Sequence, residues 1–93
     1  MDITHVYVSQ RKLRNPGQIP AMMQAIANGQ FLPKIILNHN KDGSIQVEDG
    51  HHRIVSFWLM CKYELEDHEY LLLEKDRQRP AFGLIQDLIE RIK

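Results

Sequence analysis

The chain has 93 residues, of which 43% are hydrophobic and 26% charged, and its formal net charge at pH 7 is zero. This length suits one domain with a modest core, and the composition disfavours disorder, a membrane span and steering toward nucleic acid by net charge. We expect no secretory signal from the N-terminal residues, and the single cysteine, Cys61, favours a cytoplasmic protein without disulfides.

The first third of the chain predicts a strand and then a helix. β-Branched and aromatic residues are frequent in residues 3–8, which is typical of a strand. Pro20 suits the first turn of a helix, and Asn28-Gly29 suits its end. The apolar spacing predicts that the buried face of this helix consists of Met22, Met23, Ile26 and Ala27.

The middle of the chain predicts a β-hairpin followed by a buried helix. An apolar run at residues 35–37 and an alternating segment at residues 44–48 flank a turn signal at residues 40–43. A helix would begin at His51 and end near Lys62. Its apolar residues lie on nearly every side, which indicates a central position: Ile54, Val55, Phe57, Trp58, Leu59 and Met60.

The last part predicts a buried strand at residues 69–73 and an amphipathic helix at residues 81–93. Apolar residues recur at helical spacing in that helix: Phe82, Leu84, Ile85, Leu88, Ile89 and Ile92. This stripe could pack on the chain's own sheet, or it could bind a second copy or another protein. The fold expected for residues 1–93 is one α+β domain, a small mixed sheet with a central buried helix and a core within residues 3–74.

Between the hairpin and the central helix lies Asp49-Gly50-His51-His52-Arg53, which combines the features of an anion site. The first turn of a helix has N–H groups without intrahelical partners and carries about half a positive charge. Gly50 allows close approach to the backbone, and Arg53 offers a bidentate fork. The segment therefore predicts phosphate binding by Gly50, His51, His52 and Arg53.

Asp49 has several possible roles. Asp49 follows Ile45 and Val47 at every second position of the strand, so we expect it to share their face and point toward the covered side of the sheet. There it could orient an imidazole or hold a phosphate-bound Mg²⁺ ion, which makes Asp49, His51 and His52 candidate catalytic residues. The alternative is a helix N-cap, worth about 1 kcal/mol. Because adjacent helical residues diverge by about 100°, one histidine could also be a plain surface residue.

Basic residues form two further clusters that could contact phosphates or nucleic acid, or could simply be solvated: Arg11, Lys12 and Arg14, then Arg77 and Arg79. No cysteine and histidine spacing indicates a zinc site. The simplest reading of Cys61 is a small buried hydrophobic residue.

The segment Val-Glu-Asp-Gly-His-His-Arg-Ile-Val, residues 47–55, resembles the signature of the ParB/sulfiredoxin superfamily. Residues 29–37 are similar to the Gly-x-x-x-Pro-Ile-x-Val segment that precedes the hairpin in that family. Residues 61–63 and 69–73 resemble the end of its helix and the strand that follows. The likeness covers roughly residues 3–74 and implies a ParB-like fold.

The resemblance implies a domain that binds nucleotide or nucleic-acid phosphates, with ATP or CTP and Mg²⁺ as cofactors, and with Mg²⁺-dependent nuclease or NTPase activity. His51 stands where sulfiredoxins carry the catalytic cysteine, which disfavours their reaction. Residues after 74 are too few for a helix-turn-helix region, so we do not expect partition-type DNA binding. The alternative is a catalytically inactive interaction module that keeps the fold, such as a phage- or plasmid-type accessory protein.

Overall fold

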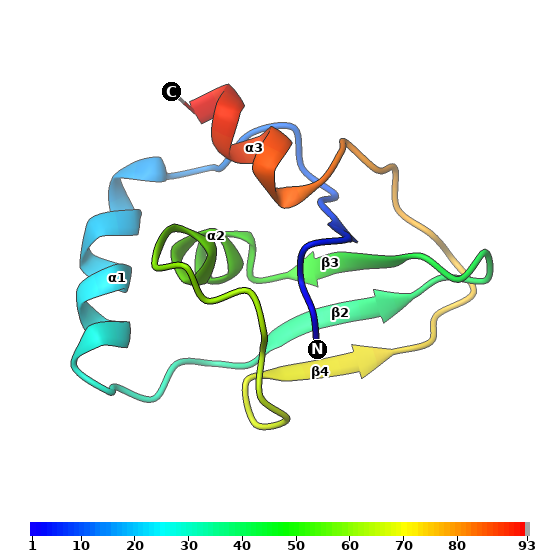
Figure 1. Cartoon of the computed structure of the whole chain (residues 1–93). Helices are drawn as coiled ribbons and strands as arrows, with labels where there is room; N and C mark the ends of the chain where they lie inside the picture. The colour runs from blue at the N-terminus through cyan, green and yellow to red at the C-terminus, as the bar shows by residue number, and fades with distance from the viewer. Residues whose placement is uncertain (93) are drawn as a thin grey trace.

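The chain, described for residues 1–92 in a computed structural model, interleaves short strands and helices (Figure 1). They follow in the order β1 (Val6–Tyr7), the 3₁₀ helix η1 (Pro16–Gln18), α1 (Ile19–Ala27), β2 (Ile35–His39), β3 (Ile45–Asp49), α2 (His51–Leu59), β4 (Tyr70–Leu73) and α3 (Ile85–Ile92). None of the helices among these residues is long and apolar enough to cross a membrane.

The strands form one mixed sheet in the order β1-β3-β2-β4. The predicted hairpin is confirmed, because β2 and β3 pair antiparallel with Leu37 opposite Val47. The outer strands pair in parallel, β1 with β3 and β4 with β2. The α+β class and the mixed sheet are therefore as expected.

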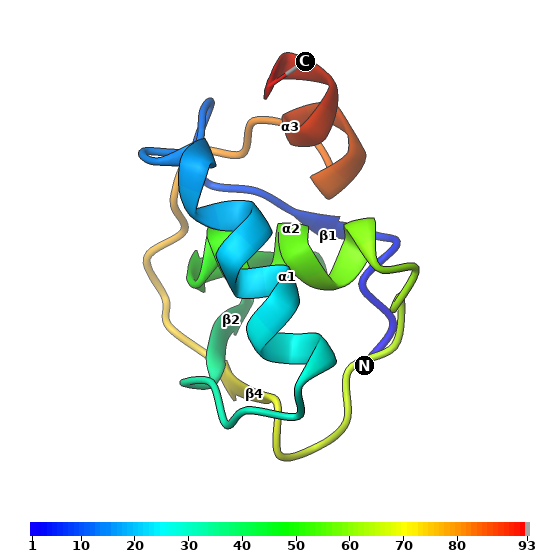
Figure 2. The same cartoon turned by 90° about the vertical axis from the view of Figure 1, so that its left-hand side faces the viewer.

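The helix α2 packs against one face of the sheet near the end of β3, and α1 lies on the outer side of α2, beyond the ends of the strands (Figures 1 and 2). Ile35, Leu37 and Val47 of the sheet are buried with Ile54 and Val55 of α2, which confirms α2 as the central helix. The opposite face is crossed by residues 74–80, which we call the strap. It returns the chain from β4 toward α3 at the other side of the sheet (Figure 2).

Polar side chains anchor the strap to the sheet. The Lys75 amide donates to Asn38 Oδ1 at 2.8 Å, and the Arg79 amide donates to Gln46 Oε1 at 3.1 Å. Asn38 and Gln46 are both fully buried. Their amide groups satisfy the strap backbone where apolar side chains could not, which explains two polar residues at the centre of a small sheet.

The N-terminal strand is shorter than predicted. Only β1 pairs with the sheet, and the residues on either side bond to other segments. The Ile3 amide donates to the Tyr63 carbonyl at 2.9 Å, and the Val8 amide donates to the Gly83 carbonyl at 2.8 Å. Residues 3–8 are therefore extended, but they hydrogen-bond in turn to the segment at Tyr63, to β3 and to the segment at Gly83.

Several expected burials are wrong. Leu71 and Leu72 of β4 are exposed, because this strand lies at the edge of the sheet and not inside it. The expected buried face of α1 is only partly buried, and Ala27 is exposed, because α1 packs over α2 at the periphery. Cys61 is exposed and has a left-handed backbone (φ 61°), since α2 ends at Leu59 and not near residue 62.

The C-terminal helix begins at Ile85, four residues later than predicted. Gly83 is left-handed (φ 93°), and the Leu84 amide donates to Asp87 Oδ2 at 2.8 Å, which sets the helix start. The predicted stripe packs within the chain, because Ile85, Leu88 and Ile89 are buried and α3 lies against α2. A dimer or partner contact through that stripe would have to displace this packing.

Candidate functional site

The start of α2 is built around Gly50, which is the N-cap residue and has a left-handed backbone (φ 104°). No side chain caps this helix end, so the expectation of Asp49 as the cap is wrong. The Arg53 side chain folds back over the glycine: a Cβ at position 50 would lie 2.9 Å from Arg53 Nη2. Glycine is therefore favoured by its left-handed conformation, and any larger residue would also displace the Arg53 guanidinium.

Asp49 does not point toward the covered side of the sheet. Its side chain is 78% exposed, and its carboxylate lies 3.7 Å from Arg53 Nη2. The pairing of β2 and β3 is irregular here, because Ile36 lies opposite Asp49 while the next residue, Leu37, lies opposite Val47. An extra residue in one strand breaks the alternation on which the expectation depended.

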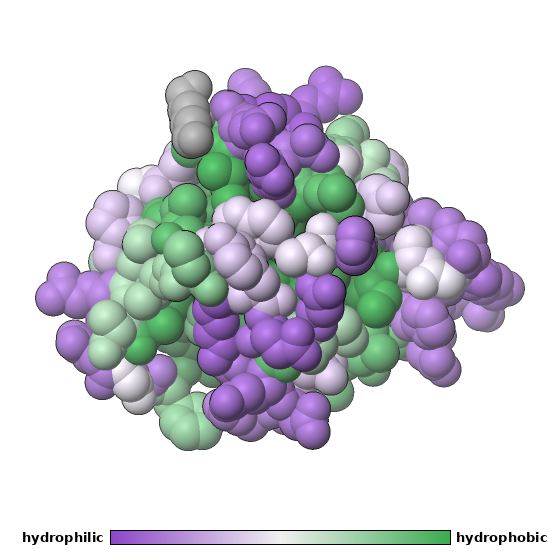
Figure 3. Space-filling view, viewed as in Figure 1, coloured by the Kyte–Doolittle hydropathy of each residue, from purple (hydrophilic) through white to green (hydrophobic). Residues whose placement is uncertain are grey.

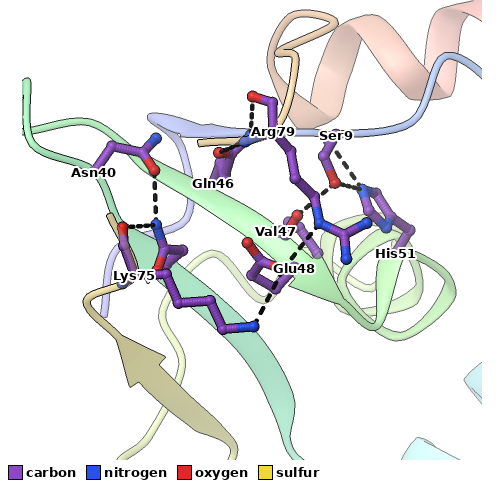
Figure 4. A network of polar contacts seen from close by, with 9 residues as sticks. Ser9, Asn40, Gln46, Val47, Glu48, His51, Lys75 and Arg79 are labelled. Carbon is purple, nitrogen blue, oxygen red and sulfur yellow. Dashed lines mark hydrogen bonds and ion pairs between the residues drawn. The ribbon is translucent and has the colours of Figure 1, made fainter. Parts of the chain in front are cut away.

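His51 is buried in the polypeptide and already has a partner. The Ser9 amide donates to its Nε2 at 3.0 Å, which places the proton of the neutral ring on Nδ1. The Ser9 hydroxyl in turn donates to the Val47 carbonyl at 2.6 Å (Figure 4). His51 therefore ties the loop after β1 to the start of α2.

His52 holds the other end of the same loop. The Asn15 amide donates to His52 Nε2 at 3.2 Å. The two adjacent histidines face different directions, as helical geometry requires, and each accepts a backbone amide from one end of residues 9–15. This basic loop, further anchored by the buried Leu13, is thereby held beside the start of α2.

Arg53 is the most enclosed cation at this end of α2. Its side chain is only 16% exposed, and Nη2 donates to the Lys34 carbonyl at 3.2 Å. Its Nε atom is buried with no hydrogen-bond partner. A buried donor without a partner is costly, so the hydrogen-bonding capacity of the Arg53 guanidinium is not fully used within the chain.

Two of the predicted basic residues lie close enough to affect His51. Burial lowers the pKa of His51 from 6.5 to about 4, and the neighbouring His52 adds to this effect. Arg79 and Arg14 lower the pKa further, whereas Asp49 opposes them. The basic loop and the strap thus both bring positive charge to the start of α2.

Arg79 is held there by Glu48, a residue that the sequence analysis missed. Arg79 Nε donates to Glu48 Oε2 at 2.9 Å, and Lys75 Nζ lies 4.0 Å from the same oxygen (Figure 4). Only 6% of the Glu48 side chain is exposed. Glu48 is two positions after Gln46, so both polar side chains lie on one face of the strand. This spacing was the signal in the sequence that could have identified Glu48.

The remaining predicted basic residues do not join this group. The Arg11 guanidinium lies 5.2 Å from the centre of the Phe82 ring, and its carbonyl accepts from Arg91 at 2.8 Å, so Arg11 faces α3. Lys12 and Arg77 are exposed. The two basic clusters therefore contribute one residue each, Arg14 and Arg79, to the surroundings of His51.

The buried, neutral His51 predicts a loss of stability in acid. Its pKa in the folded chain is below the ordinary value, so the unfolded chain takes up the proton first. The contribution of neutral His51 to the free energy of unfolding is complete above pH 6.5. It is lost as the pH falls toward 4, by up to about 3 kcal/mol. Chemical unfolding at pH 7, 6, 5 and 4 measures this loss. In His51→Gln the loss should be smaller, whereas in the matched control His5→Gln, at an exposed histidine, it should match the parent chain.

In comparisons with known proteins, no family model, no curated protein and no solved structure matches this chain.

Proposed function

We propose that the start of α2 binds the phosphate group of a nucleotide or nucleic acid. The observation that carries this proposal is the tie between the basic loop and the helix end, in which His51 and His52 each accept a backbone amide from residues 9–15. This arrangement holds positive charge beside first-turn N–H groups that no side chain caps.

The binding groups differ from the histidines that the motif first suggests. Gly50 gives a phosphate access to the backbone, and Arg53 supplies a guanidinium whose Nε has no hydrogen-bond partner within the chain. Arg14 adds charge from the basic loop, and Arg79, which is paired with Glu48, lies on the other flank. His51 and His52 position the loop as acceptors, and this is the role in which we propose them.

The resemblance to the ParB/sulfiredoxin superfamily, which we also propose as the family, agrees with a phosphate at this element. It favours ATP or CTP with Mg²⁺ over free phosphate. Asp49 is exposed and next to Arg53, so it is the carboxylate that would hold Mg²⁺ beside a bound phosphate. Nuclease or NTPase activity would build on this same binding step.

A thermal-shift series tests the proposal, with ATP, CTP, ADP, inorganic phosphate and a short oligonucleotide, each with and without Mg²⁺. A ligand at 100 times its dissociation constant stabilises the folded chain by about 2.7 kcal/mol. We expect at least one nucleotide or the oligonucleotide to raise the melting temperature, and Arg14→Ala to reduce that rise.

The matched control is Lys12→Ala, which removes the same charge from an exposed position of the same loop. It should leave the rise largely intact. Phosphate release from ATP and CTP in the same samples, repeated with Asp49→Asn, measures hydrolysis. If no member of the series shifts the melting temperature of the parent chain, the proposed phosphate site is wrong.

A further inference from the structure

A groove lies on the α1 side of the molecule, away from the start of α2. It is bounded by the loop after α1, by Phe57 of α2 and by residues 62–69, and its volume is about 250 Å³. Figure 3 shows hydrophobic surface over α1 and the loop that follows it, bordered by hydrophilic surface over the loop between α2 and β4. Phe31, at the rim, is 92% exposed.

The wall of the groove is apolar. Ile26, Leu32 and Phe57 line it, and Lys62 Nζ lies 5.4 Å from the centre of the Phe57 ring. A single apolar side chain exposed on a surface is ordinary. An aromatic ring exposed almost completely beside an apolar hollow is the arrangement of a binding anchor, because aromatic residues are enriched where partners bind.

The remaining rim is acidic. Lys62 Nζ and Glu69 Oε1 lie 2.8 Å apart, so these two charges neutralise one another. Burial raises the pKa of Glu69, but hydrogen bonds from Lys62 and from the Glu66 amide outweigh it and keep the carboxylate ionised. Glu66, which lines the groove, is exposed and lies 3.5 Å from His68 Nδ1, and it has no lysine or arginine partner among the described ion pairs. Asp67, the next residue, is exposed beside the lining.

From these features the geometry points to a docking site for an extended segment of a partner protein, with one apolar side chain flanked by lysine or arginine. The groove is below the roughly 300–1,000 Å³ of sites for drug-sized molecules, and its size suits one or two side chains. Charge complementarity with Glu66 and Asp67 selects a basic segment. The same carboxylates would repel the phosphates of a nucleic acid.

This site is separate from the proposed phosphate site, so each can be tested without the other. A phage-displayed library of random dodecapeptides is selected on the immobilised full chain. We expect enriched sequences to share an aliphatic or aromatic residue next to lysine or arginine. A synthetic peptide of the enriched sequence is then measured by fluorescence anisotropy against the parent chain and variants.

Phe31→Ser should weaken that peptide at least fivefold without changing the thermal unfolding of the chain, because Phe31 is exposed. Glu66→Lys should weaken it similarly and improve binding of a peptide in which the basic residues are replaced by glutamate. Arg14→Ala, at the other site, should leave peptide affinity unchanged.

The inference would be overturned by no enriched sequence, by an acidic consensus, by a peptide that binds Phe31→Ser as well as the parent chain, or by a peptide weakened as strongly by Arg14→Ala. Binding of a labelled oligodeoxythymidine that depends on Phe31 would also overturn it, since the ring would then serve as a platform for stacking bases.

Discussion

Replacing Arg53 with alanine is expected to weaken nucleotide binding by about ten- to a hundredfold, which corresponds to the roughly 1.5–3 kcal/mol of hydrogen bonds to a charged group. Arg53 combines a buried, unpaired Nε atom with a position over Gly50. Isothermal titration calorimetry with the ligand found by thermal shift measures the loss. Arg53→Lys keeps the charge but lacks the fork, so it should fall between alanine and the parent chain.

The matched control for Arg53 is Lys41→Ala. This variant removes one positive charge from the turn between β2 and β3, which lies at the end of β3 away from α2. Lys41 pairs there with Asp76 at 3.6 Å. This variant should bind the ligand within about twofold of the parent chain, because screening limits the reach of exposed charges to about 10 Å. Parent-like affinity in a folded Arg53→Ala chain would contradict the proposed role of Arg53.

Leu88→Ala is expected to lower the free energy of unfolding by about 2–5 kcal/mol, the usual result of removing a buried leucine side chain. Leu88 is fully buried in α3, against α2. Ile92→Ala is the matched control on the same helix, because Ile92 is 37% exposed. The free energy of unfolding should fall less in Ile92→Ala than in Leu88→Ala, by at least about 1 kcal/mol.

Urea unfolding at two protein concentrations measures both variants. If α3 stabilises the single chain, the midpoints should not depend on concentration. A midpoint of the parent chain that rises with concentration, and a concentration dependence that Leu88→Ala removes, would show instead that the stripe joins two copies.

The proposed phosphate-binding segment, residues 49–53, shows how much a local sequence pattern can predict. Residues 49–53 could be located from sequence because a glycine before an apolar helix, followed by histidines and arginine, is a local feature. The direction of Asp49 could not, because it depends on an irregular pairing between β2 and β3. The alternation of side chains within one strand does not reveal whether that strand has an extra residue relative to the strand it pairs with.

The histidines show the same limit in chemical terms. Their types suggest donors to an anion, yet each accepts an amide from residues 9–15, about 40 positions away in the chain. Which role an imidazole takes depends on the partner that tertiary folding supplies. Arg79 likewise belongs beside His51 only because the strap crosses the sheet and Glu48 holds the guanidinium there.

By itself, the sequence determined the elements whose signals are local: the turn and alternation of the hairpin, the apolar α2, and the stripe of α3. These patterns depend on spacing within a few residues. The structure contains each of these elements, although Leu59 is exposed in α2, and in α3 the stripe is buried only at Ile85, Leu88 and Ile89. Tertiary structure alone decided that β4 is an exposed edge, that β1 has only two paired residues, and that buried polar side chains anchor the strap. The physical reason is that an apolar run looks the same at the edge and in the centre of a sheet. Strand order and backbone pairing depend on contacts between residues far apart in the chain.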